Sequence, residues 1–105
     1  MTSKERAFLR GLANGLNSII NIGKAGVTPE LVSMADEALA ARELIKIGML
    51  DNTETTITDA ARMVSERTRS EVVQVIGRKI VLYRKPKSGK EPVIKIPSFK
   101  NIKPK

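Results

Sequence analysis

The stretch that most constrains the fold of this chain is SIINIGKAGVTPE, residues 18–30. Residues 18–22 are short, rich in isoleucine and bounded by Asn-Gly signals, which predicts a strand. Thr28 is a natural helix N-cap, and Pro29 suits the first helical position, where its missing N–H is no loss. The sequence therefore predicts a strand joined to a helix by a Gly-x-x-Gly loop.

The rest of the chain also alternates helical and strand patterns. Thr2 and Glu5 have the spacing of a capping box, followed by Phe8, Leu9, Leu12, Ala13 and Leu16 at helical intervals around an Asn14-Gly15 break. The helix that starts at Pro29 is expected to run to about Arg42, and a strand is expected around residues 45–47. A third helix is predicted from Thr58 to about Arg69.

EVVQVIGRKIVLYR, residues 71–84, predicts two strands joined at Gly77-Arg78, since glycine at the first central position suits a type II′ hairpin. The expected order is helix, strand, helix, strand, helix, strand, strand. The remaining tail holds four prolines among lysines and is expected to be extended and flexible, although PVIKIP (92–97) could add a short edge strand.

Length and residue usage narrow the functional class. A chain of 105 residues suits one domain with one core. Cysteine and histidine are both absent, which disfavours disulfides, common zinc sites, thiolate chemistry and the usual general base. No stretch has the length of a membrane span or the form of a signal peptide. We expect a cytoplasmic, monomeric protein without enzymatic activity, metal or cofactor.

Charge is distributed unevenly. The formal net charge is +8, but residues 84–105 hold eight basic residues against one acidic residue, while residues 1–83 hold eleven against ten. Such an excess indicates a polyanionic partner, of which nucleic acid is the commonest. A basic tail kept for solubility is the alternative.

The Gly-x-x-Gly loop Gly23-Lys24-Ala25-Gly26 suggests where a phosphate could bind. Glycines permit positive φ and close backbone approach, and the following helix start offers N–H groups and a dipole that favour an anion. The Walker A and dinucleotide motifs do not fit, because Val27 and Thr28 follow the last glycine. Two glycines between a strand and a helix are also compatible with a simple turn.

Four blocks of the sequence together resemble the CRM domain (chloroplast RNA splicing and ribosome maturation), in its short bacterial YhbY-like form. They occur in the family's order and spacing, and the resemblance spans roughly residues 3–97. The blocks are LRGLAN (9–14), INIGKAGVT (20–28), ALAARELIKI (38–47) and VQVIGRKIVLYR (73–84).

The resemblance implies a compact α/β domain with a four-stranded mixed sheet and three helices, similar to the C-terminal domain of a translation initiation factor. It also implies RNA binding through the Gly-x-x-Gly loop, association with precursors of the large ribosomal subunit, and a basic position at Arg10. We expect an RNA-binding domain over residues 1–97 and a basic tail over 98–105. The candidate RNA-binding residues are Gly23, Lys24, Ala25, Gly26, Lys4, Arg6, Arg10, Arg78, Lys79 and Arg84.

Recognition is expected to rest on RNA backbone and shape, because the only aromatic residues are Phe8, Tyr83 and Phe99. Three alternatives stay open. The chain could bind nucleic acid generally, or it could bind a ribosomal protein instead of RNA. An enzyme using the carboxylates Asp36, Glu37, Asp51 and Glu54 is disfavoured, because adjacent helical residues do not face each other.

Overall fold

A computed structural model describes residues 1–51, 55–87 and 89–97. The basic tail, residues 98–105, and Glu54 therefore lie outside the described residues, as does Phe99. The elements follow the expected order, and the sheet has the strand order β1-β2-β4-β3. Their bounds are α1 Ser3–Ala13, β1 Ser18–Ile22, α2 Pro29–Arg42, β2 Leu44–Met49, α3 Ile57–Thr68, β3 Glu71–Ile76 and β4 Lys79–Tyr83.

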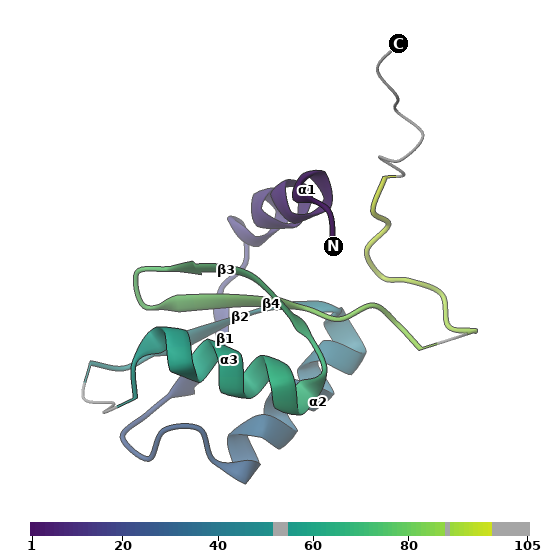
Figure 1. The fold of residues 1–105 in the computed structure, drawn as a ribbon. Coiled ribbons are helices and arrows are strands. Elements are labelled where there is room, and N and C mark those ends of the chain that lie inside the picture. Colours follow the sequence, from purple (N-terminus) through teal and green to yellow (C-terminus); the bar gives the residue numbers. More distant parts are fainter. Residues whose placement is uncertain (52–54, 88, 98–105) are drawn as a thin grey trace.

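The sheet is mixed and lies between two helical layers. β1 pairs with β2 in parallel, and the other two pairings are antiparallel. α1 covers one face of the sheet, and α2 and α3 cover the other (Figure 1). The expected single α/β domain of three helices and four strands is confirmed.

Alternation along the central strands explains why the sheet is buried on both faces. On β4, Ile80 and Leu82 enter the core under α2 and α3, whereas Val81 and Tyr83 pack with α1. The larger core also takes Leu31, Ala35 and Leu39 from α2, at the helical spacing that the sequence predicts. The smaller core joins Leu9 and Ala13 to Leu44, Val73, Val81 and Tyr83.

The capping residues set the helix ends. The Thr2–Glu5 capping box is present, and Thr28 Oγ1 accepts a hydrogen bond from the Leu31 N–H at 3.1 Å. The third helix begins at Ile57, one residue before the predicted start, because Thr56 Oγ1 accepts the Asp59 N–H at 3.2 Å.

The apolar side predicted for the first helix is only partly buried. Leu9 and Ala13 enter the core, but Leu12 and Leu16 remain 42% and 37% exposed. Leu16 is exposed because α1 ends at Ala13, which places Leu16 beyond the helix and outside its periodicity. Leu12 lies within α1 but on a side of the helix that the core does not cover.

The short edge strand that the sequence allowed over residues 92–97 does not form. The N–H groups of Val93 and Ile94 instead donate to the carboxylate of Glu43, each at 2.9 Å. Ile94 and Ile96 pack against Phe8 and the smaller core. The segment therefore runs beside α1 rather than along a sheet edge (Figure 1).

Candidate nucleic-acid interface

The Gly-x-x-Gly loop forms a tight turn after β1. The Gly26 N–H donates to the Gly23 carbonyl at 3.0 Å, and Gly26 has a φ of 76°. Gly23 is not in the positive-φ region, and a Cβ there would make an ordinary contact of 3.8 Å with Leu50 Cδ1. Only Gly26 thus requires glycine for its backbone conformation, so the expectation for two such positions is half right.

The start of α2 offers fewer anion-binding groups than the sequence suggests. Pro29 has no N–H, and the Leu31 N–H already donates to Thr28 Oγ1. Glu30 adds an exposed carboxylate in the first turn. Two of the four N–H groups that a helix start normally leaves free are absent or used, so Lys24 and the loop backbone have to supply most of the attraction for an anion.

The loop shares one end of the sheet with the β3–β4 hairpin turn. β1 and β2 run in parallel and end there, and β4 begins there because it is antiparallel to β2. The Leu50 N–H donates to the Ile22 carbonyl, and the Met49 N–H donates to the Arg78 carbonyl, both at 2.9 Å. We call this edge, with residues 23–26 and the Gly77-Arg78 turn, the loop end of the sheet.

Arg78 and Lys79 lie at the loop end but differ in their partners. The Arg78 guanidinium donates to the carbonyls of Met49 and Leu50 and lies 3.0 Å from the Asp51 carboxylate. Its charge is therefore partly offset, and it anchors the chain that leaves β2. Lys79 Nζ donates to Ser18 Oγ at 2.9 Å.

Within the described ranges, neither Lys24 nor Lys79 forms an ion pair with a carboxylate. Lys24 and Ala25 are exposed at the tip of the loop. Among the described residues, these two lysines give the loop end a positive charge that no ion-paired carboxylate offsets, and the exposed Glu30 in the first turn of α2 opposes it.

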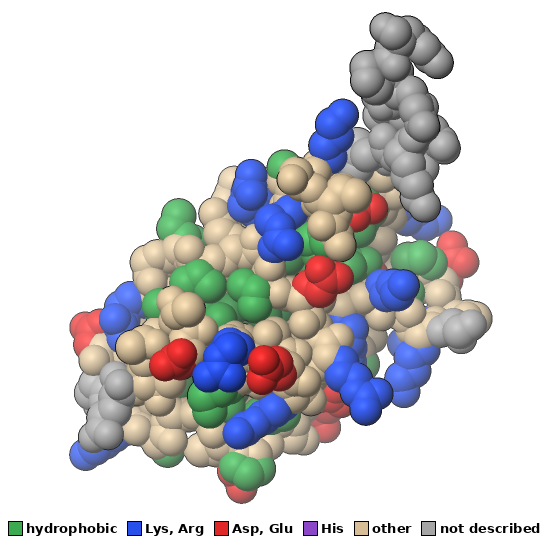
Figure 2. Space-filling model, in the orientation of Figure 1, with side chains coloured by type: hydrophobic (Ala, Val, Ile, Leu, Met, Phe, Trp, Pro, Cys, Tyr) green, Lys and Arg blue, Asp and Glu red, His purple; other side chains and the backbone are tan. Residues whose placement is uncertain are grey.

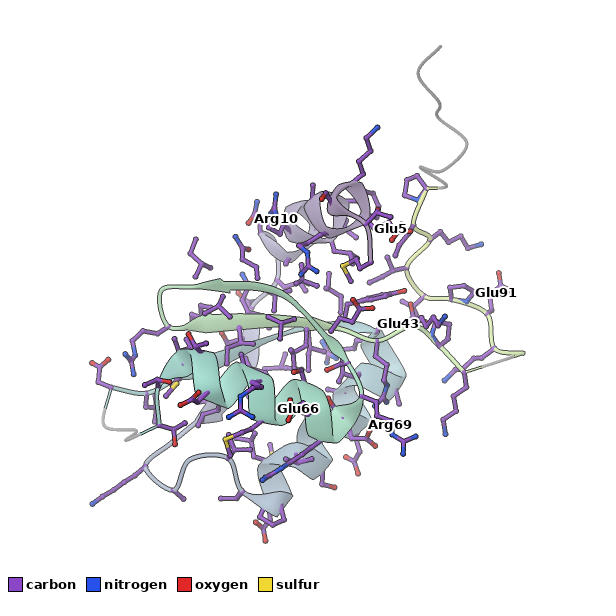
Figure 3. The ribbon with its side chains drawn as sticks, in the orientation of Figure 1. Glu5, Arg10, Glu43, Glu66, Arg69 and Glu91 are labelled. Atoms are coloured by element: carbon purple, nitrogen blue, oxygen red, sulfur yellow. The ribbon has the colours of Figure 1, made fainter. Side chains whose placement is uncertain are left out.

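The basic residues of α1 divide into different roles. The Arg6 guanidinium donates to the carbonyls of Val72 and Val73 at the irregular part of β3, so it fixes the helix to the strand. Arg10 is exposed and points away from the side of α1 that carries Glu5 (Figure 3). Lys4 is exposed and, six residues before Arg10, lies about 120° away from it around the helix.

Arg84 is not part of this surface. It follows Tyr83, which pairs with Leu44 at the end of the sheet opposite to the loop. Its guanidinium lies 2.6 Å from the Asp36 carboxylate and also donates to the carbonyls of Asp36 and Thr68. With 20% of its side chain exposed, Arg84 ties α2, α3 and β4 together.

The outer face of α3 carries charges of both signs. Arg62 lies 3.8 Å from Asp59 and 3.6 Å from Glu66, and blue and red side chains alternate over this helix (Figure 2). A face of this kind has little net attraction for an anion.

Two of the surface carboxylates considered in the sequence are paired with arginines. Asp36 and Asp51 are paired with Arg84 and Arg78, and in the described part of the chain no three His, Cys, Asp or Glu side chains gather as a metal site. Phe8 is half-buried and Tyr83 is buried. Burial raises the pKa of the Tyr83 phenol above its ordinary 10.0, and the charges of Glu43, Glu5 and Glu71 raise it further.

Sequence reasoning missed two groups of residues. Glu43, 1% exposed, holds the 93–94 backbone, and nothing local to it in the sequence announces this partner fifty residues away. Ser18 and Asn21 lie beside Lys79 on the sheet. The sequence signal that could have indicated them is their polar character within an isoleucine-rich strand. No helix among the described residues is long and apolar enough to cross a membrane.

Comparisons with known proteins agree on one family. A family model described as the CRS1 / YhbY (CRM) domain matches residues 1–84. The chain is 42% identical over 91 residues to the protein named "Probable RNA-binding protein YqeI" of Bacillus subtilis, covering 87% of this chain and 95% of that protein. It is 31% identical over 90 residues to a protein of Haemophilus influenzae named "RNA-binding protein", covering 86% and 91% of the two chains.

A solved structure is also similar. The solution structure of a hypothetical protein from Staphylococcus aureus superposes with a TM-score of 0.75 at 41% sequence identity. The similarity covers 92% of this chain and 99% of that one, so the whole described fold, and not a fragment of it, is shared.

Proposed function

The chain belongs to the CRS1 / YhbY (CRM) domain family, and from this membership we propose that it is a non-enzymatic RNA-binding protein. Relatives in Bacillus subtilis and Haemophilus influenzae, which align with most of this chain, carry RNA binding in their names. The net charge of +8 supports a polyanionic ligand. Residues 1–97 form the RNA-binding unit in this proposal, and residues 98–105 form a basic extension.

The loop end of the sheet is the proposed contact surface, and the observation that carries this assignment is the geometry of the Gly-x-x-Gly turn. Gly26, with its φ of 76°, closes a turn whose tip exposes Lys24 and Ala25. Gly23 and Gly26, which flank the Lys24-Ala25 pair, have no Cβ atoms, so a phosphate can approach the main chain closely at these two positions. Lys24 then supplies the counter-charge without competition from an ion-paired carboxylate.

The mode of recognition follows from the side chains available. Of the aromatic residues that the structure describes, Tyr83 is buried and Phe8 is half-buried against the smaller core, so they do not form an exposed platform on which successive bases can stack. Lysine and arginine contacts to phosphates position an RNA without reading its bases. The protein therefore recognises the course of the RNA backbone, and hence the shape of a folded RNA.

The biological role that fits a shape-reading RNA binder of this family is assembly of the large ribosomal subunit. In this proposal the protein acts as a monomer in the cytoplasm and holds a segment of immature ribosomal RNA in a conformation that can fold further. Crosslinking in cells followed by sequencing of the bound RNA tests this role. Enrichment of large-subunit ribosomal RNA is expected, and reads scattered over messenger RNA would contradict it.

Replacement of Gly26 by valine tests the contact surface. A residue with a Cβ at positive φ costs about 1–2 kcal/mol. The added Cβ lies 3.5 Å from Thr55 Oγ1, which is an ordinary van der Waals contact, so the domain should stay folded. We expect the Gly26→Val variant to bind a structured large-subunit RNA fragment at least about tenfold more weakly, a loss of about 1.4 kcal/mol.

Gly89→Val is the matched control. Gly89 has a φ of 85°, and open space surrounds the position that a Cβ would take, so the substitution imposes similar backbone strain far from the loop end. Its RNA affinity should equal that of the parent. Equal affinity of both variants, with unchanged circular dichroism, would mean that the loop is only a turn.

A further inference from the structure

Part of the sheet face on the α1 side is not covered by α1. The smaller core under α1 uses Leu44, Val73, Val81 and Tyr83, which lie toward the end of the sheet that is opposite to the loop. Nearer the loop end, the strand registers place one row across all four strands on this face. The row consists of Asn21, Gly48, Lys79 and Ile76.

Gly48 lies within this row, and side chains of neighbouring strands occupy the space that its missing side chain leaves. A Cβ on Gly48 would clash with Asn21 Oδ1, and it would lie 3.3 Å from Lys79 Nζ and 3.4 Å from Ser18 Oγ. Polar atoms from β1 and β4 thus meet above a bare position on β2. Because Gly48 is not at positive φ, the requirement for glycine here is space and not backbone conformation.

Lys79 reaches across the sheet through this space. Its side chain starts on β4, passes over Gly48 and donates to Ser18 Oγ on β1 at 2.9 Å. A lysine normally keeps a mobile ammonium group in solvent, with several rotatable bonds to order when it binds. Here the ammonium is already held above the sheet by a neutral hydroxyl, so much of the ordering cost of binding an anion has been met in the free protein.

The surroundings of this ammonium favour a phosphate. No described carboxylate forms an ion pair with Lys79, and Lys46, two residues before Gly48 on β2, faces the same side of the sheet. Asn21 turns its amide oxygen Oδ1, an acceptor, into the space above Gly48 where Lys79 Nζ also lies, and the ammonium retains donors beyond the one given to Ser18. The remaining N–H donors of the Lys79 ammonium lie on an exposed surface, which suits the oxygens of a phosphodiester.

We propose that Ser18, Asn21 and Lys79, arranged over Gly48, form a second phosphate site for the RNA strand that contacts the Gly-x-x-Gly loop. The proposal rests on the proposed function. Gly23 follows Asn21 by two residues, about 7 Å along the strand, so one RNA backbone can pass from the loop onto the sheet face. The RNA path therefore crosses β1, β2 and β4 and does not follow α3.

Two substitutions test this site, one by charge and one by shape. Lys79→Gln removes the ammonium, and we expect at least about fivefold weaker binding of the structured RNA, with the slope of log affinity against log salt shallower by about 0.7. Gly48→Ala keeps every charge but displaces Asn21 and Lys79 from their places, and we expect a similar loss of affinity. Lys87→Gln, an exposed lysine beyond the opposite end of the sheet, is the control and should change affinity less than about twofold.

The outcomes separate this site from the proposed function. If Lys79→Gln binds like Lys87→Gln while Gly26→Val still weakens binding, the second site is wrong and the loop assignment stands. A folded Gly48→Ala with parental affinity would overturn the geometric argument, and if that variant does not fold, Lys79→Gln decides alone. Failure of the parent protein to bind RNA would end both proposals. Saturable binding of inorganic phosphate alone, lost in Lys79→Gln but without effect on RNA affinity, would assign the site to the free ion.

Discussion

The buried carboxylate of Glu43 should carry an unusual share of the stability of this domain. It is 1% exposed, and its two oxygens accept the N–H groups of Val93 and Ile94, each at 2.9 Å. These bonds hold the segment that packs Ile94 and Ile96 against Phe8 and the smaller core. Glu43→Gln is the most conservative change that tests this clamp.

The size of the effect follows from the donors and acceptors. A hydrogen bond to a charged acceptor contributes about 1.5–3 kcal/mol, and a neutral one about 0.5–1.5 kcal/mol. Glutamine can keep one neutral bond, but its NH₂ group then faces the second N–H donor, so the direct loss is about 2–4 kcal/mol. Release of the segment into water limits this loss, because the freed N–H groups are then solvated. We expect a decrease of about 2 kcal/mol, or roughly 8–16 °C in Tm.

Urea and thermal unfolding followed by circular dichroism measure the decrease, and limited proteolysis within residues 86–97 reports release of the segment. Glu91→Gln is the matched control, because within the described part of the chain Glu91 makes an exposed ion pair with Lys95 at 3.3 Å and is not buried. It should change stability by less than about 0.5 kcal/mol. Equal stability and equal protease resistance of the two variants would refute the clamp.

Three further predictions concern charge. Arg10→Glu should weaken RNA binding more than Arg62→Glu, since Arg62 is already paired with two acids on α3; equal losses in a filter-binding or fluorescence assay would place α1 outside the interface. Removal of residues 98–105, which contain three lysines, should make the salt dependence of binding shallower by about 2 if all three meet phosphates, while discrimination between structured ribosomal RNA and an unrelated RNA persists. Because Tyr83 is the only tyrosine, its ionisation can be followed by ultraviolet titration. Its pKa should lie above 10.0 in the folded protein and at the ordinary 10.0 in urea. Because the pKa of Tyr83 is raised in the folded state, its contribution to the free energy of unfolding is fully present below pH 10 and is lost as the pH rises through the pKa of the folded protein. The Tyr83→Phe variant should not show this loss of stability at high pH.

Local signals predicted most of the fold. The second helix begins and ends at the predicted residues because Thr28, Pro29 and the apolar spacing act within a few positions of each other. The hairpin turn at Gly77-Arg78 likewise depends on one glycine, whose φ of 57° fits the type II′ geometry. Such features need no knowledge of distant contacts.

The errors arose where distant parts of the chain meet. Residues 92–97 alternate like a strand, but their N–H groups find Glu43 before they find a sheet edge. Glu43 itself sits at a φ of 70° at the end of α2, a conformation for which a glutamate gives no sequence signal. Both outcomes depend on tertiary packing that a local pattern cannot contain.

The candidate site shows the same division. The loop and its lysine were visible in the sequence, but the roles of individual cations were not. Arg6 and Arg84 are of the residue type that commonly contacts nucleic acid, yet the guanidinium groups of both donate to backbone carbonyls of other elements. Charge alone cannot distinguish an arginine that holds the fold from one that is free for a ligand.

NMR chemical-shift mapping with a structured fragment of large-subunit ribosomal RNA tests the central claim most directly, because every amide reports separately. We predict that the largest changes occur at residues 21–26, at Gly48 and Lys79, and around Arg10. Amides of α3 and of residues 89–97 should change little. Changes concentrated on α3 or on residues 89–97, with the Gly-x-x-Gly loop unaffected at saturation, would contradict it.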